Sequence, residues 1–169
     1  MSMSEWDDRS GWLFQIVPVP GESFGHYLGR FRRANELSRV GVAAFLALDV
    51  RIVRGWEMPS YGQPVSLAQL TQVSELLGLS VAELMAMLPA ERRQLHLATR
   101  LCPACYADAP IHQRDWQRAE LTQCECHHQP FLTACPECGT PFRLPCGRTA
   151  VVSNAGSPFR GCAPSALIK

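Results

Sequence analysis

The cysteines constrain this chain most, because all eight of them lie at or after Cys102. In a reducing compartment, such a density of thiols indicates metal sites or redox chemistry rather than disulfides. The residues before Cys102 carry nearly all of the helical periodicity. The chain is therefore predicted to be a small α-rich protein of two modules, a helical domain over residues 1–97 and a zinc-binding domain over residues 98–169.

The first metal site is predicted from the spacing of its donors. Cys102 and Cys105 are separated by two residues, the spacing at which two thiolates converge on one tetrahedral ion. Cys124 and His127 have the same spacing about twenty residues later and complete the set. Cys126 offers an alternative register, but the spacing favours Cys124 with His127. Three thiolates and one imidazole leave no open position for a substrate, so we expect a structural zinc ion.

A second zinc site is predicted only in part. Cys135 and Cys138 form another pair with this spacing, and no Cys-x-x-Cys or Cys-x-x-His pair follows them. Three interpretations are open: Cys146 and Cys162 complete the site through a long loop, the pair holds no metal, or the tail after about Pro145 is frameshifted.

The frameshift hypothesis comes from the residues that follow the second pair. For some of the allowed codons, a shift of one base turns residues 150–159 into a string that ends Cys-x-x-Cys-Gly-x-Pro-Phe. Residues 135–142 have the same pattern. The shifted string would therefore supply the second cysteine pair that a four-cysteine zinc ribbon requires. The nucleotide sequence of the gene tests this hypothesis.

The helical module begins with an apolar stripe formed by Phe24, Tyr27, Leu28 and Phe31. This three- and four-residue spacing predicts a helix from about Ser23 to Leu37.

Two further segments lie between this helix and the next capped one. Arg39 to Val50 is a more apolar stretch, and Gly55 to Pro64 contains enough proline and glycine to predict a loop.

On the side of the first helix opposite its apolar stripe lie His26, Arg30 and Arg33, which are expected to form a solvated face.

Two capping boxes predict the next pair of helices. Ser66 with Gln69 and Ser80 with Glu83 have the required three-residue spacing. Two capped helices around the turn at Gly78 have the pattern of a helix-turn-helix, and a helical hairpin that only packs is the alternative. Glu83 is a poor reader of bases, which weakens the DNA-binding interpretation.

Composition limits the other function classes. The chain has 169 residues and a net charge of +1, so nucleic-acid binding would need a local patch rather than the overall charge. No apolar run approaches the roughly 18 residues that span a bilayer. The acidic, polar start is unlike a secretory signal, and we expect a cytoplasmic protein.

Several segments together resemble the TniQ family, and most closely the short TniQ of type V-K CRISPR-associated transposons. They are Trp12-Leu13-Phe14, Pro20-Gly21-Glu22-Ser23, the Leu28-Gly29-Arg30 run with Asn35, Leu101 to Tyr106, Trp116, and the series Cys124, His127, Cys135 and Cys138. The tail departs from the family, because the last Cys pair is missing. The resemblance implies a bacterial, non-catalytic adaptor for target selection. It would bridge an RNA-guided effector, with its guide RNA and target DNA, to the AAA+ ATPase TnsC, which recruits the transposase.

The resemblance also suggests contact residues. Trp12 and Phe14 are candidate anchors for TnsC, unless they pack on the protein's own core. Four arginines near the first helix have guanidinium groups that suit phosphates of RNA or DNA, unless they only form a solvated face: Arg30, Arg32, Arg33 and Arg39.

Two other function classes compete with an adaptor. A zinc or thiol enzyme would need an open coordination position or an activated cysteine beside a base, and the sequence indicates neither, so we expect no catalysis and no small-molecule substrate. A stand-alone zinc-containing helix-turn-helix regulator would bind a specific duplex by itself with steep salt dependence, whereas an adaptor should bind tightly only with its partners.

Overall fold

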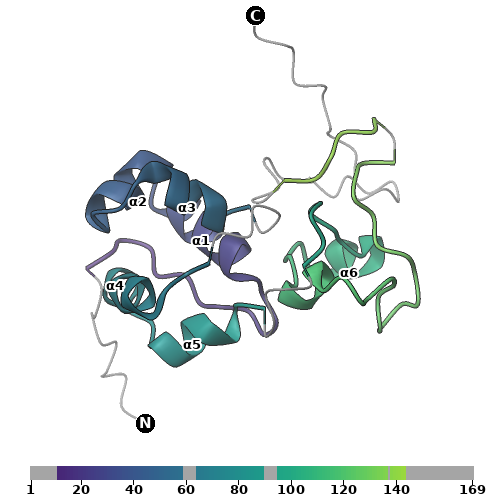
Figure 1. The fold of residues 1–169 in the computed structure, drawn as a ribbon, viewed down its shortest axis with the longest axis horizontal. Coiled ribbons are helices and arrows are strands. Elements are labelled where there is room, and N and C mark those ends of the chain that lie inside the picture. The colour runs from purple at the N-terminus through teal and green to yellow at the C-terminus, as the bar shows by residue number, and fades with distance from the viewer. Residues whose placement is uncertain (1–10, 59–63, 90–94, 137, 144–169) are drawn as a thin grey trace, which may run out of the picture.

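The computed structural model describes residues 11–58, 64–89, 95–136 and 138–143. These residues form a small helical protein with isolated β-bridges and no strand. The helices are α1 (Phe24–Ala34), α2 (Arg39–Phe45), α3 (Val50–Trp56), α4 (Leu67–Leu77), α5 (Val81–Ala86) and α6 (Pro103–Asp108), followed by a 3₁₀ turn at Arg114–Gln117. Figure 1 shows α1 to α5 grouped together and the residues around α6 forming a second part.

The capping boxes predicted from the sequence are both confirmed. The Ser66 hydroxyl accepts from the Gln69 N–H at the start of α4, and Ser80 does the same with Glu83 at the start of α5. Gly78 ends α4 in the left-handed conformation, with φ +68°. Glycine reaches this conformation without the steric cost of a Cβ atom.

The first helix is shorter than predicted. It begins after Ser23 as expected but ends at Ala34 rather than Leu37. Asn35 caps the end with its backbone N–H, and Glu36 turns the chain with φ +54°.

The apolar segment from Arg39 to Val50 does not form one continuous element. Ala47 adopts φ +50° between α2 and α3, and the Asp49 side chain accepts from the Arg51 N–H to start α3. The loop predicted from Gly55 was placed too early, because α3 continues to Trp56. Residues 59–63 of that loop lie outside the described residues.

The larger hydrophobic core surrounds α1. Its buried members come from α1 to α5 and the adjoining turns, and Leu28, Val42, Val53, Val73 and Leu84 are fully covered. At Gly25 a Cβ atom would stand 2.5 Å from the Trp56 carbonyl oxygen, so α1 and the end of α3 are in backbone contact there. A smaller cluster around Leu101 and Trp116 forms the core of the second part.

The segment before α1 joins the two parts. The Ser23 N–H donates to the His112 carbonyl at 2.8 Å, and the Arg114 N–H donates to the Gly21 carbonyl at 2.9 Å. Inside this joint His112 Nδ1 and Ser23 Oγ form a buried hydrogen bond of 2.8 Å. The residues that start α1 therefore also position the part of the chain that carries the cysteines.

No helix among the described residues is long and apolar enough to cross a lipid bilayer.

Candidate metal centre

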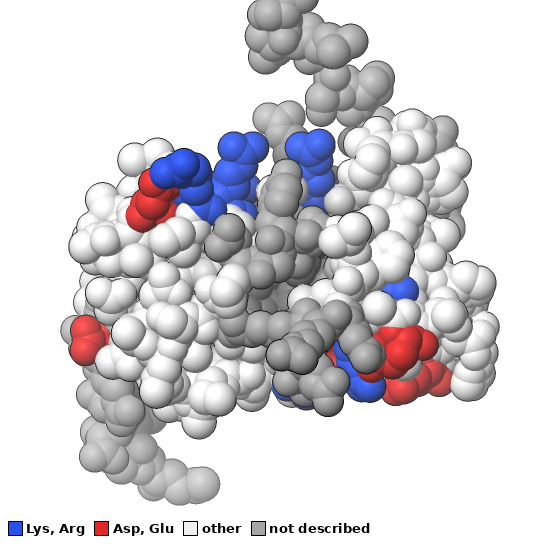
Figure 2. Space-filling view, in the orientation of Figure 1, with Lys and Arg blue, Asp and Glu red and all other residues white. Residues whose placement is uncertain are grey.

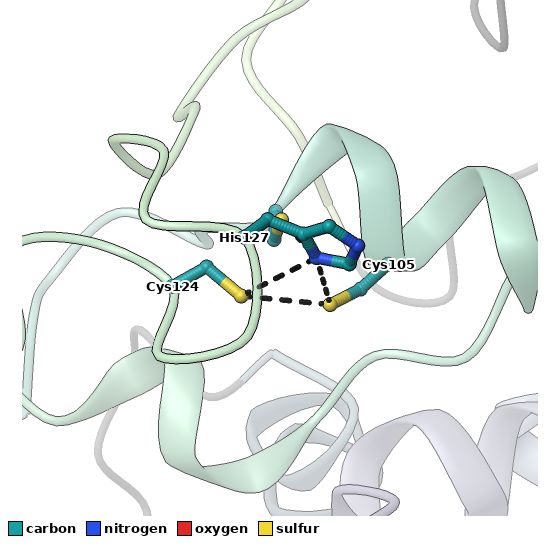
Figure 3. A group of neighbouring side chains, drawn as sticks. Cys105, Cys124 and His127 are labelled. Atoms are coloured by element: carbon teal, nitrogen blue, oxygen red, sulfur yellow. Dashed lines mark hydrogen bonds between the residues drawn. The ribbon is translucent and has the colours of Figure 1, made fainter.

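Four side chains predicted from spacing alone come together in the second part. Cys102 precedes α6 and Cys105 lies on its first turn, while Cys124 and His127 lie on a turn that folds back against it. Their four donor atoms all lie within 4.8 Å of one another. Figure 3 shows Cys105, Cys124 and His127 turned toward a common point.

The separations between donor atoms resemble those of a tetrahedral site. His127 Nδ1 lies 3.7 Å from Cys102 Sγ, 3.2 Å from Cys105 Sγ and 3.8 Å from Cys124 Sγ. Cys105 Sγ and Cys124 Sγ are 3.5 Å apart. Around a zinc ion, the usual bond lengths give about 3.8 Å between two thiolate sulfurs and about 3.5 Å between sulfur and nitrogen. The cluster can therefore hold one metal ion, with His127 binding through Nδ1.

The thiols need a cation if all three are to ionise. Burial raises the pKa of Cys105 to about 12, and hydrogen bonds with Cys124 and Cys102 add to that effect. Burial also raises the pKa of Cys124, but hydrogen bonds led by the His127 backbone N–H outweigh it and lower this pKa to about 6. One thiolate thus forms easily and its neighbour resists a second negative charge. A divalent ion removes that resistance, because it neutralises the thiolates as they bind.

The ligand turn has a backbone pattern of its own. The Cys124 N–H donates to the Gln129 carbonyl, and the His128 N–H donates back to the Cys124 carbonyl. His128 adopts φ +51°, which reverses the chain directly after the candidate ligand His127. Cys126 is exposed and lies outside the four-donor cluster, so the register with Cys124 and His127 is the one that the structure adopts.

The turn at Cys135 repeats this pattern. The Cys135 N–H donates to the Thr140 carbonyl, and Gly139, with φ +68°, donates to the Cys135 carbonyl. Cys135 is buried and Cys138 is exposed. This turn therefore has the backbone of a ligand turn, although the described residues place no third donor beside it. Cys146, Cys162 and the tail of the frameshift hypothesis lie outside the described residues.

Arg100 supports the centre and was missed by the sequence analysis. It is buried, and its guanidinium donates to the carbonyls of Trp116, Leu121 and Arg118 at 2.8, 2.8 and 2.5 Å. It also lies over the Phe131 ring, 4.9 Å from the ring centroid. Burial lowers its pKa. A lone buried arginine beside a cysteine pair gives no sequence signal, because its partners are backbone carbonyls.

The arginines proposed to contact phosphates mostly pair with two buried carboxylates. Arg30 donates to Glu22 at 2.8 and 2.6 Å. Arg32 and Arg39 both donate to Glu57, at 2.7 and 2.6 Å. Both glutamates are fully buried, so these ion pairs connect elements inside the protein.

The solvated face expected on the first helix is not present as a whole. His26 is buried, and its Nδ1 lies 2.6 Å from Glu22 Oε1, while Arg30 is partly covered by its pairing with the same glutamate. Arg33 alone of the three is exposed.

The two aromatic candidates lie in different environments. Trp12 makes edge-to-face contacts with Phe31 and Phe45, each with ring centroids 5.3 Å apart, and its Nε1 donates to the Leu76 carbonyl. Phe14 keeps 52% of its surface exposed. Trp12 thus packs on the core, and of these two candidates Phe14 is the one that stays accessible to a partner.

Comparison with models of known protein families and with curated proteins finds no match for this chain.

Proposed function

We propose that this protein is a zinc-stabilised, non-catalytic adaptor of the TniQ type, which couples an RNA-guided target complex to the AAA+ regulator TnsC. The observation that carries the proposal is the four-donor cluster, at the positions that the resemblance implies for a structural zinc. Three thiolates and an imidazole fill a tetrahedral zinc shell and leave no position for a substrate.

The metal is proposed to be zinc because of its donor set. Soft thiolates with one imidazole in a tetrahedral arrangement select zinc over hard cations such as magnesium or calcium. When bound, the ion supplies folding energy rather than reaction chemistry. Asp108 Oδ2 lies 3.9 Å from Nε2 of His127, near enough for electrostatic attraction and too far for a hydrogen bond.

A second argument comes from the residues that carry the resemblance in the first module. Glu22 and Ser23 are buried at the joint between the helical part and the second part. A joint held by buried hydrogen bonds keeps two surfaces in a defined relation, which lowers the ordering cost when one molecule bridges two partners.

The proposal is tested by capture on an immobilised chain, with its metal content measured on the same sample. TnsC with ATP and the guide-RNA effector from the same genome are added separately and together. We expect one zinc per chain at least, and retention of TnsC that increases when the effector and target DNA are present. Failure to retain TnsC under every condition would contradict the adaptor function.

The stand-alone regulator is the second candidate, and the same samples distinguish it. A regulator would bind one duplex tightly without TnsC or effector, whereas the adaptor should gain most of its affinity from them.

A further inference from the structure

The joint between the two parts uses a short segment of the second part that begins at His112. The Ser23 N–H donates to the His112 carbonyl at 2.8 Å, and the Arg114 N–H donates to the Gly21 carbonyl at 2.9 Å. The Arg114 guanidinium also donates to the carbonyl of Ala86, the last residue of α5. This segment is therefore docked against both the start of α1 and the end of α5.

The 3₁₀ turn that follows the segment reaches the metal centre. Its residue Trp116 is buried in the same hydrophobic cluster as the candidate ligands Cys102 and Cys124. The Trp116 ring also packs edge-to-face on His112, with ring centroids 5.4 Å apart and an interplanar angle of 83°. One short stretch of chain thus contacts the joint at His112 and the metal centre at Trp116.

The same turn positions the residues that lead into the first ligand pair. Gln117 is buried, and its Oε1 accepts from the Arg100 N–H at 2.8 Å, two residues before Cys102. Its Nε2 donates to the carbonyls of His96 and Ala98 at 2.9 and 3.1 Å. Movement of this turn would therefore displace the chain that carries the first two thiols.

The Ser23 hydroxyl links the joint to the helical part. Ser23 is the N-cap residue of α1, and its Oγ accepts from the His26 N–H at 3.4 Å. The same Oγ lies 2.8 Å from His112 Nδ1, in a hydrogen bond between two buried side chains. If the joint opens, the imidazole can bond to water instead, so this hydrogen bond matters only to the closed joint.

We infer that His112 and Trp116 couple metal binding to the joint, so that a metal ion in the four-donor cluster also fixes the second part against α1 and α5. The ion supplies folding energy to the small core that contains Trp116. Without the ion, Trp116 should no longer support His112, and the joint should open. His112 and Trp116 are therefore positioning residues, since neither is one of the four donors.

The coupling must act in both directions. If metal binding stabilises the closed joint, contacts of the joint raise the affinity for metal by the same factor. The inference goes beyond the proposed adaptor function, because it concerns the metal and the fold and involves no partner.

The first test measures the zinc affinity of the full chain by competition with a chromophoric chelator. Ser23→Ala should weaken zinc binding about tenfold, because the buried His112 nitrogen then lacks its partner in the closed, metal-bound state.

Ser38→Ala is the matched control. Ser38 is the N-cap of α2, and its hydroxyl accepts from the Gly41 N–H at 2.9 Å within that helix. Both substitutions remove a serine cap and should lower the stability of the helical part. Zinc affinity should stay within about twofold in Ser38→Ala, which separates the role of Ser23 at the joint from its role as a cap.

A second pair of variants leaves the cap of α1 intact. Arg114→Ala removes the contact with Ala86, whereas Arg118→Ala removes an arginine that pairs locally with Glu120 at 2.7 Å. Each removes one positive charge from the second part, where side chains of both signs adjoin (Figure 2), so the change in net charge is the same. Arg114→Ala should weaken zinc binding about threefold or more, and Arg118→Ala should stay within about twofold.

Hydrogen exchange on the original chain reports on the joint directly. The N–H groups of Ser23 and Arg114 donate across the joint and should lose protection on chelation of the zinc. The Tyr27 N–H donates to the Ser23 carbonyl at 3.0 Å within the first turn of α1 and should stay protected. Adding zinc back should restore the protection of Ser23 and Arg114.

Three results would overturn the inference. Protected Ser23 and Arg114 amides after complete chelation would show that the joint closes without metal. Unchanged zinc affinity in both Ser23→Ala and Arg114→Ala, or an equal loss in Ser38→Ala, would show that the joint and the metal centre are independent. Because TnsC and the effector are absent from these samples, failure of TnsC capture would leave the coupling result standing.

Discussion

Loss of one metal ligand should unfold the second part of the molecule while the helical part stays folded. Cys102 is fully buried, and the small core around it has four buried members, Leu101, Cys102, Trp116 and Cys124, two of which are candidate ligands. That core cannot replace the metal. Structural zinc contributes an apparent 10–16 kcal/mol, so an equal share for each of four ligands is about 2.5–4 kcal/mol. A buried serine hydroxyl left without a partner adds about 1–3 kcal/mol.

Hydrogen exchange with metal analysis measures this effect for Cys102→Ser. The amides of Leu101 and Leu132 donate to each other's carbonyls at 2.9 Å, so their protection reports on the folded centre. We expect one equivalent of zinc to be lost together with this protection. The amides of α1 should stay protected, because the helical core contains no ligand.

Two variants control for the chemistry of the site. Cys126→Ser removes an exposed neighbouring thiol and should retain the metal. His127→Cys should also retain it, because a fourth thiolate completes the same tetrahedral shell. Full zinc retention by both Cys102→Ser and Cys124→Ser would refute the ligand assignment, as would protected Leu101 and Leu132 amides after exhaustive chelation.

Three other perturbations test the supporting structure by thermal or denaturant unfolding. Glu57→Gln should cost about 3 kcal/mol, because it leaves Arg32 and Arg39 without their buried carboxylate, and no change in midpoint would count against that pairing. Arg100→Met should cost more than about 3 kcal/mol, since three carbonyls lose their donor, whereas Arg118→Met should cost little. Burial, with nearby His26, lowers the pKa of His112 to about 3. The folded state therefore binds fewer protons than the unfolded state between pH about 6.5 and about 3, and acidification from pH about 7.5 to 5.5 should cost about 1.4 kcal/mol through this group. His112→Gln should flatten that dependence, and an unchanged slope would contradict it.

Local spacing was enough to predict the four-donor cluster and the starts of α4 and α5. A Cys-x-x-Cys or Cys-x-x-His pair places two donors on one turn, and a serine three residues before glutamine or glutamate satisfies the first N–H groups of a helix. Both signals depend on residues close together in the chain, so Cys102, Cys124, Ser66 and Ser80 could be interpreted without the fold.

The partners of the arginines could not be predicted in this way. Arg39 meets Glu57 eighteen residues later, and Arg30 meets Glu22 across the start of α1. Whether such a side chain faces solvent or a carboxylate depends on which elements pack together, and an isolated helical wheel does not contain that information. The expected solvated face was wrong for His26 for this reason.

The sequence by itself determined where α1, α4 and α5 begin and which four side chains can hold a metal ion, because short-range hydrogen bonding and ligand spacing act within a few residues. Only the tertiary structure decided that Trp12 packs on the core and that Glu22 and Glu57 bind arginines of α1 and α2. It also decided that Arg51 and Arg54 of α3 stay exposed. Those outcomes depend on burial and on the desolvation of charges, which arise when distant segments pack against one another.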